Sequence, residues 1–257
     1  MRIRWMTKML SLHSGPAVLL NRIAQEIDFE DTINRLLPWD PARCTLSPGA
    51  RIKALAIHIL CGLDPLYEVK DFYEDQDVAL LFGSSVTADA LNDDALVRAL
   101  DKLYEATPWT VYSTLALHAL SKLGHRLGPI HCDTNSFSLE GAYERECDLQ
   151  IAYGYSKDRR PDLKQIVLGL GVTPERLPIL ATIENGNTSD KTWNVTFIRK
   201  LRQTLSQEDW EQILYVADSA LITKRNLRYM GRLKLGFVSR LPDLFSEGET
   251  LKDLAWQ

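Results

Sequence analysis

The order of apolar and polar positions divides the chain into a helical first half and a strand-rich second half. In the first half, apolar residues recur every three or four positions, which is the spacing of amphipathic helices. Helices are predicted over residues 16–37 with an interruption near Asp28, and over residues 48–61, 66–73, 78–82, 93–105 and 107–124. Gly128 and Pro129 then mark a change of pattern.

Two of these helices carry start signals in the sequence. Ser47 precedes Pro48, which predicts a helix with Ser47 as its N-cap and proline at its first position. Asn92 or Asp93 is the expected N-cap of the helix over residues 93–105. The run over residues 52–60 is apolar almost all round, so its helix is predicted to be buried.

After residue 129 the chain changes to short apolar runs that are typical of strands. Strands are predicted over residues 130–139, 149–155, 165–172, 177–184, 213–217 and 236–240, with helices over 192–205 and 221–233. The fold class is therefore α+β. A helical N-terminal domain over residues 1–128 is followed by a mixed sheet with flanking helices over residues 129–257.

Bulk composition places the chain among globular proteins but does not select a partner. Of its 257 residues, 45% are hydrophobic and 25% are charged, and the net charge is -4, so any contact with nucleic acid must come from a local patch. The four cysteines form no CxxC pair and lack histidines at zinc-site spacing, which predicts reduced thiols and a cytoplasmic protein. No sustained apolar stretch follows the basic N-terminus, so neither a signal peptide nor a membrane partner is expected.

The residues that suggest chemistry are two aspartates, each placed after a short apolar run. Asp133 follows Ile130, His131 and Cys132, and Asp218 follows the run 213–217. Considered alone, each aspartate has a simpler structural interpretation. Asp133 could be a turn residue, and Asp218 could be a helix N-cap. Brought together by strand pairing, the two carboxylates can share a divalent metal ion. That arrangement suits the cutting and joining of phosphodiesters.

Neighbouring polar residues leave two interpretations open. His131 precedes Asp133 by two positions and is predicted on the same face of its strand, either near the site or as a packed core histidine. Asn185, Asn187 and Asp190 follow a predicted strand and either orient a substrate or build a turn.

Several longer segments resemble a known family. The segment 153–165, YGYSKDRRPDLKQ, resembles the one that follows the first catalytic strand in DDE transposases of bacterial insertion sequences. The segments 183–190, IENGNTSD, and 216–221, VADSAL, are similar to those after the third strand and around the second catalytic aspartate. LLPWDP at 36–41 and LNDD at 91–94 resemble the branch with a helical N-terminal domain, so the resemblance covers nearly the whole chain.

This resemblance implies a ribonuclease-H-like fold for residues 129–257. It implies that Asp133 and Asp218 are the first two acids of the DDE triad and hold Mg²⁺ or Mn²⁺ for phosphodiester cleavage and strand transfer. Double-stranded DNA, as transposon ends and target, is the implied partner, together with self-association. The helical domain would bind DNA ends or pair protomers.

One part of the family pattern is not found. The third acid of the family is a glutamate on a helix well beyond Asp218, in a Tyr-Arg-Glu-Lys type segment. Here Glu247 and Glu249 are the only glutamates after Asp218, and they lie within a polar stretch that predicts a loop. We therefore expect an N-terminal portion of a longer transposase, with an incomplete ribonuclease-H-like domain and impaired catalysis. An uncovered sheet edge and apolar face would then favour self-association.

Two alternatives remain open at this point. One is a non-catalytic remnant that binds DNA or a full-length transposase. The other is a ribonuclease-H-like, metal-dependent nuclease that hydrolyses DNA rather than transposing it.

Two clusters of cations are candidates for contacts with phosphates. Six basic residues and no acidic residue lie between Ala220 and Arg240, and Lys224, Arg228 and Arg232 share one helical face by their spacing. Such a stripe suits a DNA backbone, although a solvated helix face explains it equally well. The candidate DNA-binding residues are Lys157, Arg159, Arg160, Lys164, Lys224, Arg225, Arg228 and Arg232.

Overall fold

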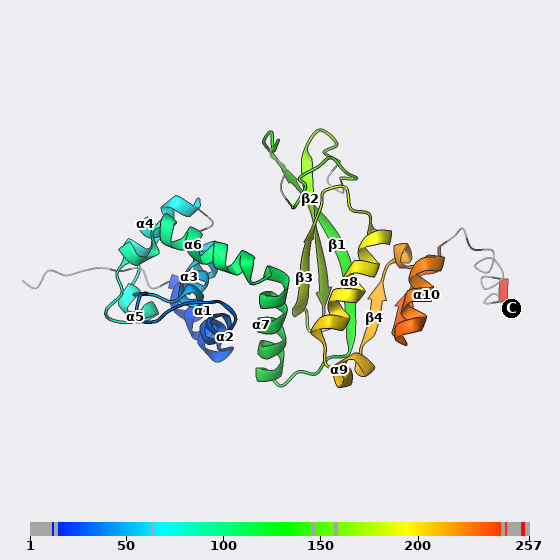
Figure 1. The fold of residues 1–257 in the computed structure, drawn as a ribbon, viewed down its shortest axis with the longest axis horizontal. Coiled ribbons are helices and arrows are strands. Elements are labelled where there is room, and N and C mark those ends of the chain that lie inside the picture. The colour runs from blue at the N-terminus through cyan, green and yellow to red at the C-terminus, as the bar shows by residue number, and fades with distance from the viewer. Residues whose placement is uncertain are drawn as a thin grey trace, which may run out of the picture. The chain divides into compact units, whose positions relative to one another are not determined.

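The computed structural model describes residues 12, 15–62, 64–144, 148–156, 159–242, 245 and 253–254. Its contacts divide the chain into two compact units, Met1–Val111 and Tyr112–Gln257. Helices make up the first unit, and a mixed five-stranded sheet with flanking helices forms the second (Figure 1), which confirms the predicted fold class. The contacts divide within the helix α7 (Pro108–Lys122), whereas the strands begin only after residue 128.

The first unit follows the apolar periodicity of the sequence closely. Asp28 has a left-handed backbone (φ 48°) and separates the first two helices, as the interruption in the pattern predicts. The helices are α1 (Gly15–Glu26), α2 (Phe29–Leu36), α3 (Pro48–Cys61), α4 (Val69–Glu74), α5 (Val78–Phe82) and α6 (Asp93–Glu105), with single turns η1 (Leu66–Glu68) and η2 (Ala88–Leu91).

Both predicted helix starts are confirmed. The Ser47 hydroxyl accepts a hydrogen bond from the Ala50 amide, with Pro48 as the first residue of α3. Of the two candidates before α6, Asn92 is the residue that caps it. The predicted burial of α3 is wrong at its C-terminal end, where Ile59 and Leu60 are 55% and 67% exposed because the last turn extends past the core.

The sheet of the second unit has the strand order β3-β2-β1-β4-β5. Strand β2 runs antiparallel to both β1 and β3, whereas β4 is parallel to β1 and β5 is parallel to β4. Parallel neighbours need a crossover, and helices supply it before β4 and before β5. This is the ribonuclease-H-like arrangement. The strands are β1 (Pro129–Leu139), β2 (Lys164–Val172), β3 (Pro178–Glu184), β4 (Leu214–Ala217) and β5 (Gly236–Ser239).

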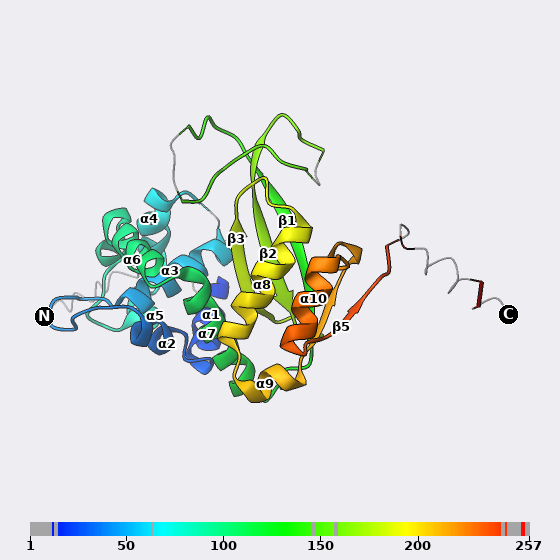
Figure 2. The ribbon, with the colours of Figure 1, turned by 45° about the vertical axis from the view of Figure 1, so that its right-hand side comes forward.

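Helices α8 (Asp190–Thr204) and α10 (Lys224–Leu233) cover the same face of the sheet (Figure 2). On that face, the Tyr215 hydroxyl of β4 donates to Asn194 of α8 at 2.8 Å. The predicted helix over residues 221–233 is divided into the turn η3 (Ser219–Leu221) and α10, because Thr223 caps α10 at its start. The short helix α9 (Gln207–Gln212) was not predicted.

Alternation along β1 decides which side chains reach solvent. Thr134 and Ser136 are buried on the face under α8, whereas His131, Asp133 and Asn135 are exposed on the opposite face. We call this opposite side the open face of the sheet. It also carries Phe137 of β1, which is 45% exposed.

The predicted strand over residues 149–155 is wrong, since only Ala152 forms a bridge, with Gln165 of β2. Side-chain bonds replace the ladder, because the Gln165 amide donates to the carbonyl oxygens of Tyr155 at 3.3 Å and Gly186 at 2.8 Å. Two segments that carry the family resemblance, 153–165 and 183–190, therefore pack against each other.

Cys44, Cys61 and Cys132 are free thiols, and Cys147 lies outside the described residues. Within the part of the chain that the structure describes, no helix is both long enough and apolar enough to cross a bilayer.

Candidate functional site

Strand pairing brings Asp133 and Asp218 side by side. In the parallel ladder between β1 and β4, Cys132 is the partner of Ala217, and each aspartate is the next residue in its strand direction. Neighbouring strands lie about 4.8 Å apart. The two carboxylates are therefore neighbours at the carboxyl end of β4.

Backbone amides hold one oxygen of each carboxylate. Asp133 Oδ1 accepts from the Thr134 amide at 2.7 Å, and Asp218 Oδ1 accepts from the Ala220 amide at 3.0 Å. Asp218 thus caps η3, as its simpler interpretation predicts. The turn interpretation of Asp133 is wrong, because β1 continues without a break to Leu139.

A hollow of about 620 Å³ on the open face contains both aspartates. Its other polar residues include His131 and Asn135, and its walls are apolar side chains of β2 and β4. Among the described residues, those that line the hollow include no lysine or arginine. Two adjacent carboxylates in one hollow favour binding of a cation or a proton.

The donor set of the hollow fits a hard divalent cation. Mg²⁺ is commonly held by one or two carboxylates, with waters and substrate phosphates completing its shell. Asp133 and Asp218 supply that minimum. Across the described ranges, no group of three or more His, Cys, Asp or Glu side chains is placed to hold a metal, and Glu247 and Glu249 fall outside those ranges.

Cys132, although adjacent to Asp133, belongs to the core rather than to the metal-binding candidates. Its side chain is on the buried face of β1 and donates to the Ile130 carbonyl at 3.5 Å. Burial raises the pKa of the Cys132 thiol, so the thiol stays protonated at neutral pH.

The polar residues after β3 have mainly structural contacts. Asp190 accepts a hydrogen bond from the Thr134 hydroxyl at 2.5 Å on the face under α8. Asn185 accepts from the Gln150 amide at 2.9 Å. Neither residue lines the hollow with Asp133, so the turn interpretation is favoured for Asn185.

Two members of the first predicted basic cluster, Arg160 and Lys164, have their charges engaged within the chain. Arg160 forms a two-pronged ion pair with Asp162, and that bond lowers the pKa of the Asp162 carboxyl. The Lys164 ammonium donates to the carbonyl oxygens of Ala142 and Tyr143. Arg159 is exposed, with a left-handed backbone (φ 58°), and Lys157 lies outside the described residues. A role in DNA binding stays a prediction for this cluster.

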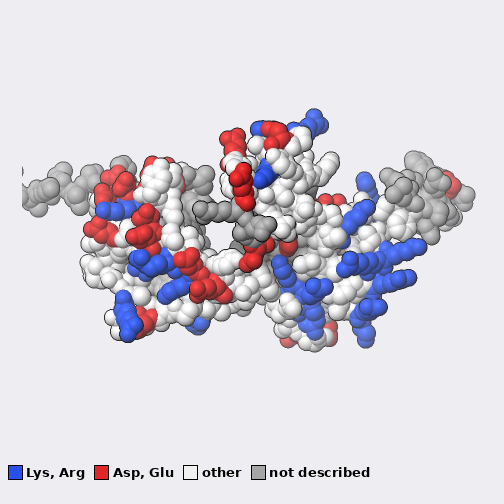
Figure 3. All heavy atoms as spheres, turned by 45° about the horizontal axis from the view of Figure 1, so that its top comes forward, with Lys and Arg blue, Asp and Glu red and all other residues white. Residues whose placement is uncertain are grey.

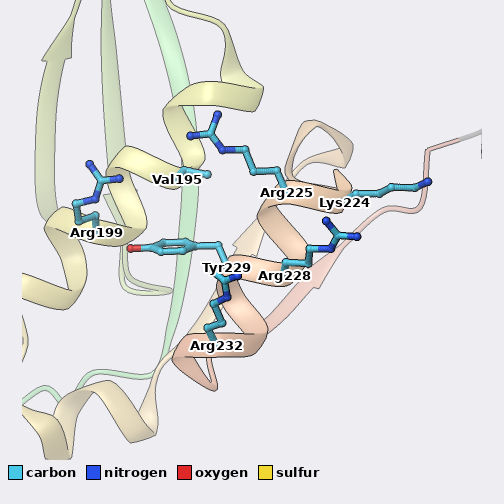
Figure 4. Close-up of a pocket in the computed structure, with 7 residues that line it drawn as sticks. All are labelled: Val195, Arg199, Lys224, Arg225, Arg228, Tyr229 and Arg232. Carbon is cyan, nitrogen blue, oxygen red and sulfur yellow. The ribbon is translucent and has the colours of Figure 1, made fainter.

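The second basic cluster lines a single groove between α8 and α10. The groove has a volume of about 430 Å³, and Arg199 and Tyr229 belong to it along with the four predicted cations of α10 (Figure 4). Sequence reasoning missed Arg199 because it lies on α8, 25 positions before Lys224. The basic run from Arg199 to Arg202 is the signal that could have found it. We call these residues the basic groove: Arg199, Lys224, Arg225, Arg228, Tyr229 and Arg232.

Comparison with known proteins yields one family profile and several solved structures. Residues 16–117 match a domain of unknown function, DUF4277, and no curated protein matches the chain. The piggyBac transposase synaptic complex with hairpin DNA aligns with 96% of this chain at 14% identity and a TM-score of 0.40. A Mos1 transposase paired-end complex with the left transposon end aligns with 80% at 9% identity and a TM-score of 0.32.

A pre-cleavage Mos1 transpososome is similar over 79% of this chain, at 10% identity and a TM-score of 0.31. The chain spans about half of the piggyBac chain (55%), and 70% and 65% of the two Mos1 chains. At these identities and TM-scores the comparisons assign no activity. The function is therefore argued from the chain's own side chains.

Proposed function

We propose that this chain is a DDE-type, insertion-sequence transposase that acts on double-stranded DNA, with Asp133 and Asp218 as its metal-binding carboxylates. The observation that carries the proposal is the parallel pairing of β1 with β4, which makes the two aspartates neighbours in one hollow. In this proposal the helical residues 1–128 recognise DNA ends or pair protomers.

The chain's own groups position the carboxylates. Amides of Thr134 and Ala220 orient one oxygen of each aspartate, and the Ser239 hydroxyl fixes the Asp218 carbonyl at 2.7 Å. A bound Mg²⁺ or Mn²⁺ would supply activation of the attacking hydroxyl and stabilisation of the leaving oxygen. With two carboxylates as ligands, we propose that metal binding is weak and that cleavage is slow.

Metal-dependent nicking of duplex DNA tests this proposal. We expect the wild-type chain to nick DNA slowly with Mn²⁺. The nicking rate should fall by about ten-fold or more in Asp133→Asn and in Asp218→Asn, because each substitution removes a charged ligand. Asp101→Asn, an exposed residue of α6, is the matched control and should behave as wild type. Electron paramagnetic resonance measures Mn²⁺ binding by the same variants, and this measurement does not depend on turnover.

The outcomes separate the three candidate functions. Mn²⁺ binding that depends on both aspartates without any nicking would favour the non-catalytic remnant. Nicking without joining of a 3′-hydroxyl end to target DNA would favour the nuclease. If neither binding nor nicking changes in the two variants, the assignment of Asp133 and Asp218 is wrong.

We propose a second copy of this chain as a further partner, and β5 is the element that favours this self-association. This strand ends the sheet, and its Phe237 and Val238 are 38% and 52% exposed. A strand edge with exposed apolar side chains is a template for pairing with another chain.

We expect Val238→Lys to lower the weight-average mass of the protein in sedimentation, because a lysine on an edge strand opposes pairing. Val97→Lys on α6, where Val97 is 43% exposed, serves as the control for added charge. An equal fall in mass in both variants, or none in either, would argue against pairing through β5.

A further inference from the structure

The strongest charged feature of the second unit lies away from the carboxylates. Lysine and arginine gather over the part of the surface formed by α8 and α10 (Figure 3). The basic groove lies on the helix-covered side of the sheet, whereas Asp133 faces the open side. The sheet itself therefore separates the two features.

The cations of the basic groove differ from neighbouring cations in the contacts that they make with the described residues. Among the described residues, Arg199, Arg225 and Arg228 make no ion pair or side-chain hydrogen bond with the protein, and the same holds for Lys224 and Arg232. Nearby cations are different, since Lys200 pairs with Glu184 at 3.3 Å and Arg202 donates to Gln207. Five positive charges whose residues line one groove repel one another, and an anion relieves that repulsion.

The helices hold these charges in a fixed row. Asn226, 1% exposed, bonds the carbonyl oxygens of Lys191 and Leu221, which ties α10 to the start of α8. Figure 4 shows the Tyr229 ring reaching toward α8, with Arg199 across the groove and Arg232 beside it. The groove is thus built on two packed helices rather than on a loop.

The length of the row suits a polyphosphate chain. Lys224 and Arg232 are eight residues apart on α10, which is roughly 12 Å along a helix axis. Phosphates of one DNA strand follow each other at about 3.4 Å along the duplex axis, so the row spans three or four of them. A single small anion would use only part of it.

We propose that the basic groove binds the sugar–phosphate backbone of duplex DNA, without a metal and independently of the carboxylates. This inference rests on the proposed function for the choice of DNA as the polyanion. It adds Arg199 and Tyr229 to the DNA contacts. It also implies that the chain contacts duplex DNA on two sides of the sheet, with the groove holding a stretch other than the one at Asp133.

Fluorescence anisotropy with a 20-base-pair duplex in EDTA measures DNA binding without metal-dependent cleavage, and the groove variants then isolate the contribution of the groove. Binding weakens as salt rises, and each neutralised phosphate adds about 0.9 to the steepness of log K against log salt. Arg199→Ala/Arg225→Ala should therefore make this dependence less steep by about 2. Arg199→Lys/Arg225→Lys should keep the slope, because the charges remain. Arg176→Ala/Lys191→Ala removes two exposed charges of the second unit that do not line the groove, and is the matched control.

Equal slopes in the groove variant and the wild type, or equal losses in the groove variant and the control, would overturn the proposal. Tighter binding of an equal-length single strand than of the duplex would overturn the choice of duplex. Asp133→Asn should bind DNA in EDTA no more weakly than wild type, so failure at the groove and failure at the carboxylates give different results.

Discussion

Replacing Glu30 by alanine is expected to lower the free energy of unfolding by about 3 kcal/mol, because it leaves a buried lysine without its counter-charge. The Lys53 side chain is 6% exposed, and its ammonium lies 3.2 Å from Glu30 Oε2. The other Glu30 oxygen accepts from the Ser47 hydroxyl at 3.0 Å. The substitution therefore removes an ion pair and loosens the N-cap of α3 at once.

The remaining contacts of Lys53 are too weak to replace Glu30. Its ammonium is 3.4 Å from the Leu81 carbonyl and 4.9 Å from the centre of the Phe82 ring. Asn34 continues the network, since it donates to the Ser47 hydroxyl and accepts from the Gly49 amide. Glu30 thus couples α2 to the start of α3.

Urea unfolding of the whole chain, followed by helical circular dichroism, measures the loss. Glu26→Ala removes a glutamate from the exposed pair with Arg22 and should cost less than about 1 kcal/mol. Glu30→Ala/Lys53→Met should recover much of the stability, because an apolar side chain replaces the buried charge. A similar, small effect of Glu30→Ala and Glu26→Ala would mean that Lys53 is solvated in the native protein.

Elements that depend on local sequence were predicted well. Ser47 followed by Pro48 defines a helix start by itself, and Asn92 caps α6 with its own side chain. Likewise, an apolar run that ends in aspartate is visible in one sequence. The pairing of Asp133 with Asp218 could be predicted because parallel strands joined by a crossover align their carboxyl ends.

Features that depend on contacts distant in sequence were missed. Residues 149–155 have the composition of a strand, but the Gln165 side chain and the Gly186 backbone bind the segment instead of a ladder. Arg199 joins the basic groove only because α10 packs on α8 through Asn226. The basic run from Arg199 to Arg202 marks Arg199 as a candidate cation, but it does not specify that contact.

Gly169 of β2 gives the second large expected effect, since an alanine there would collide with the core. A Cβ built on Gly169 lies 2.1 Å from Trp193 Nε1 and 2.4 Å from Trp193 Cε2. Trp193 is 2% exposed, packs on Phe197 and donates to the Thr182 hydroxyl at 3.2 Å. The indole cannot retreat without displacing α8 from the sheet.

We expect Gly169→Ala to cost about 3 kcal/mol, at the upper end for an overpacked core. Gly231→Ala is the matched control, because its Cβ meets nothing within 4 Å in α10, and it should stabilise the protein by about 0.5–1 kcal/mol. Urea unfolding monitored by tryptophan fluorescence measures both changes.

A double-mutant cycle tests whether Trp193 is the residue with which the new Cβ collides. Trp193→Phe loses the bond to Thr182 but opens space beside Gly169, so Gly169→Ala should cost clearly less in that background. If the free-energy costs of Gly169→Ala and Trp193→Phe are additive, the strain does not lie between these two residues. Because α8 also carries Arg199, displacement of α8 by Gly169→Ala should weaken DNA binding in EDTA, whereas Gly231→Ala should not. The packing of one glycine under one tryptophan thus links the stability of the sheet to the geometry of the basic groove.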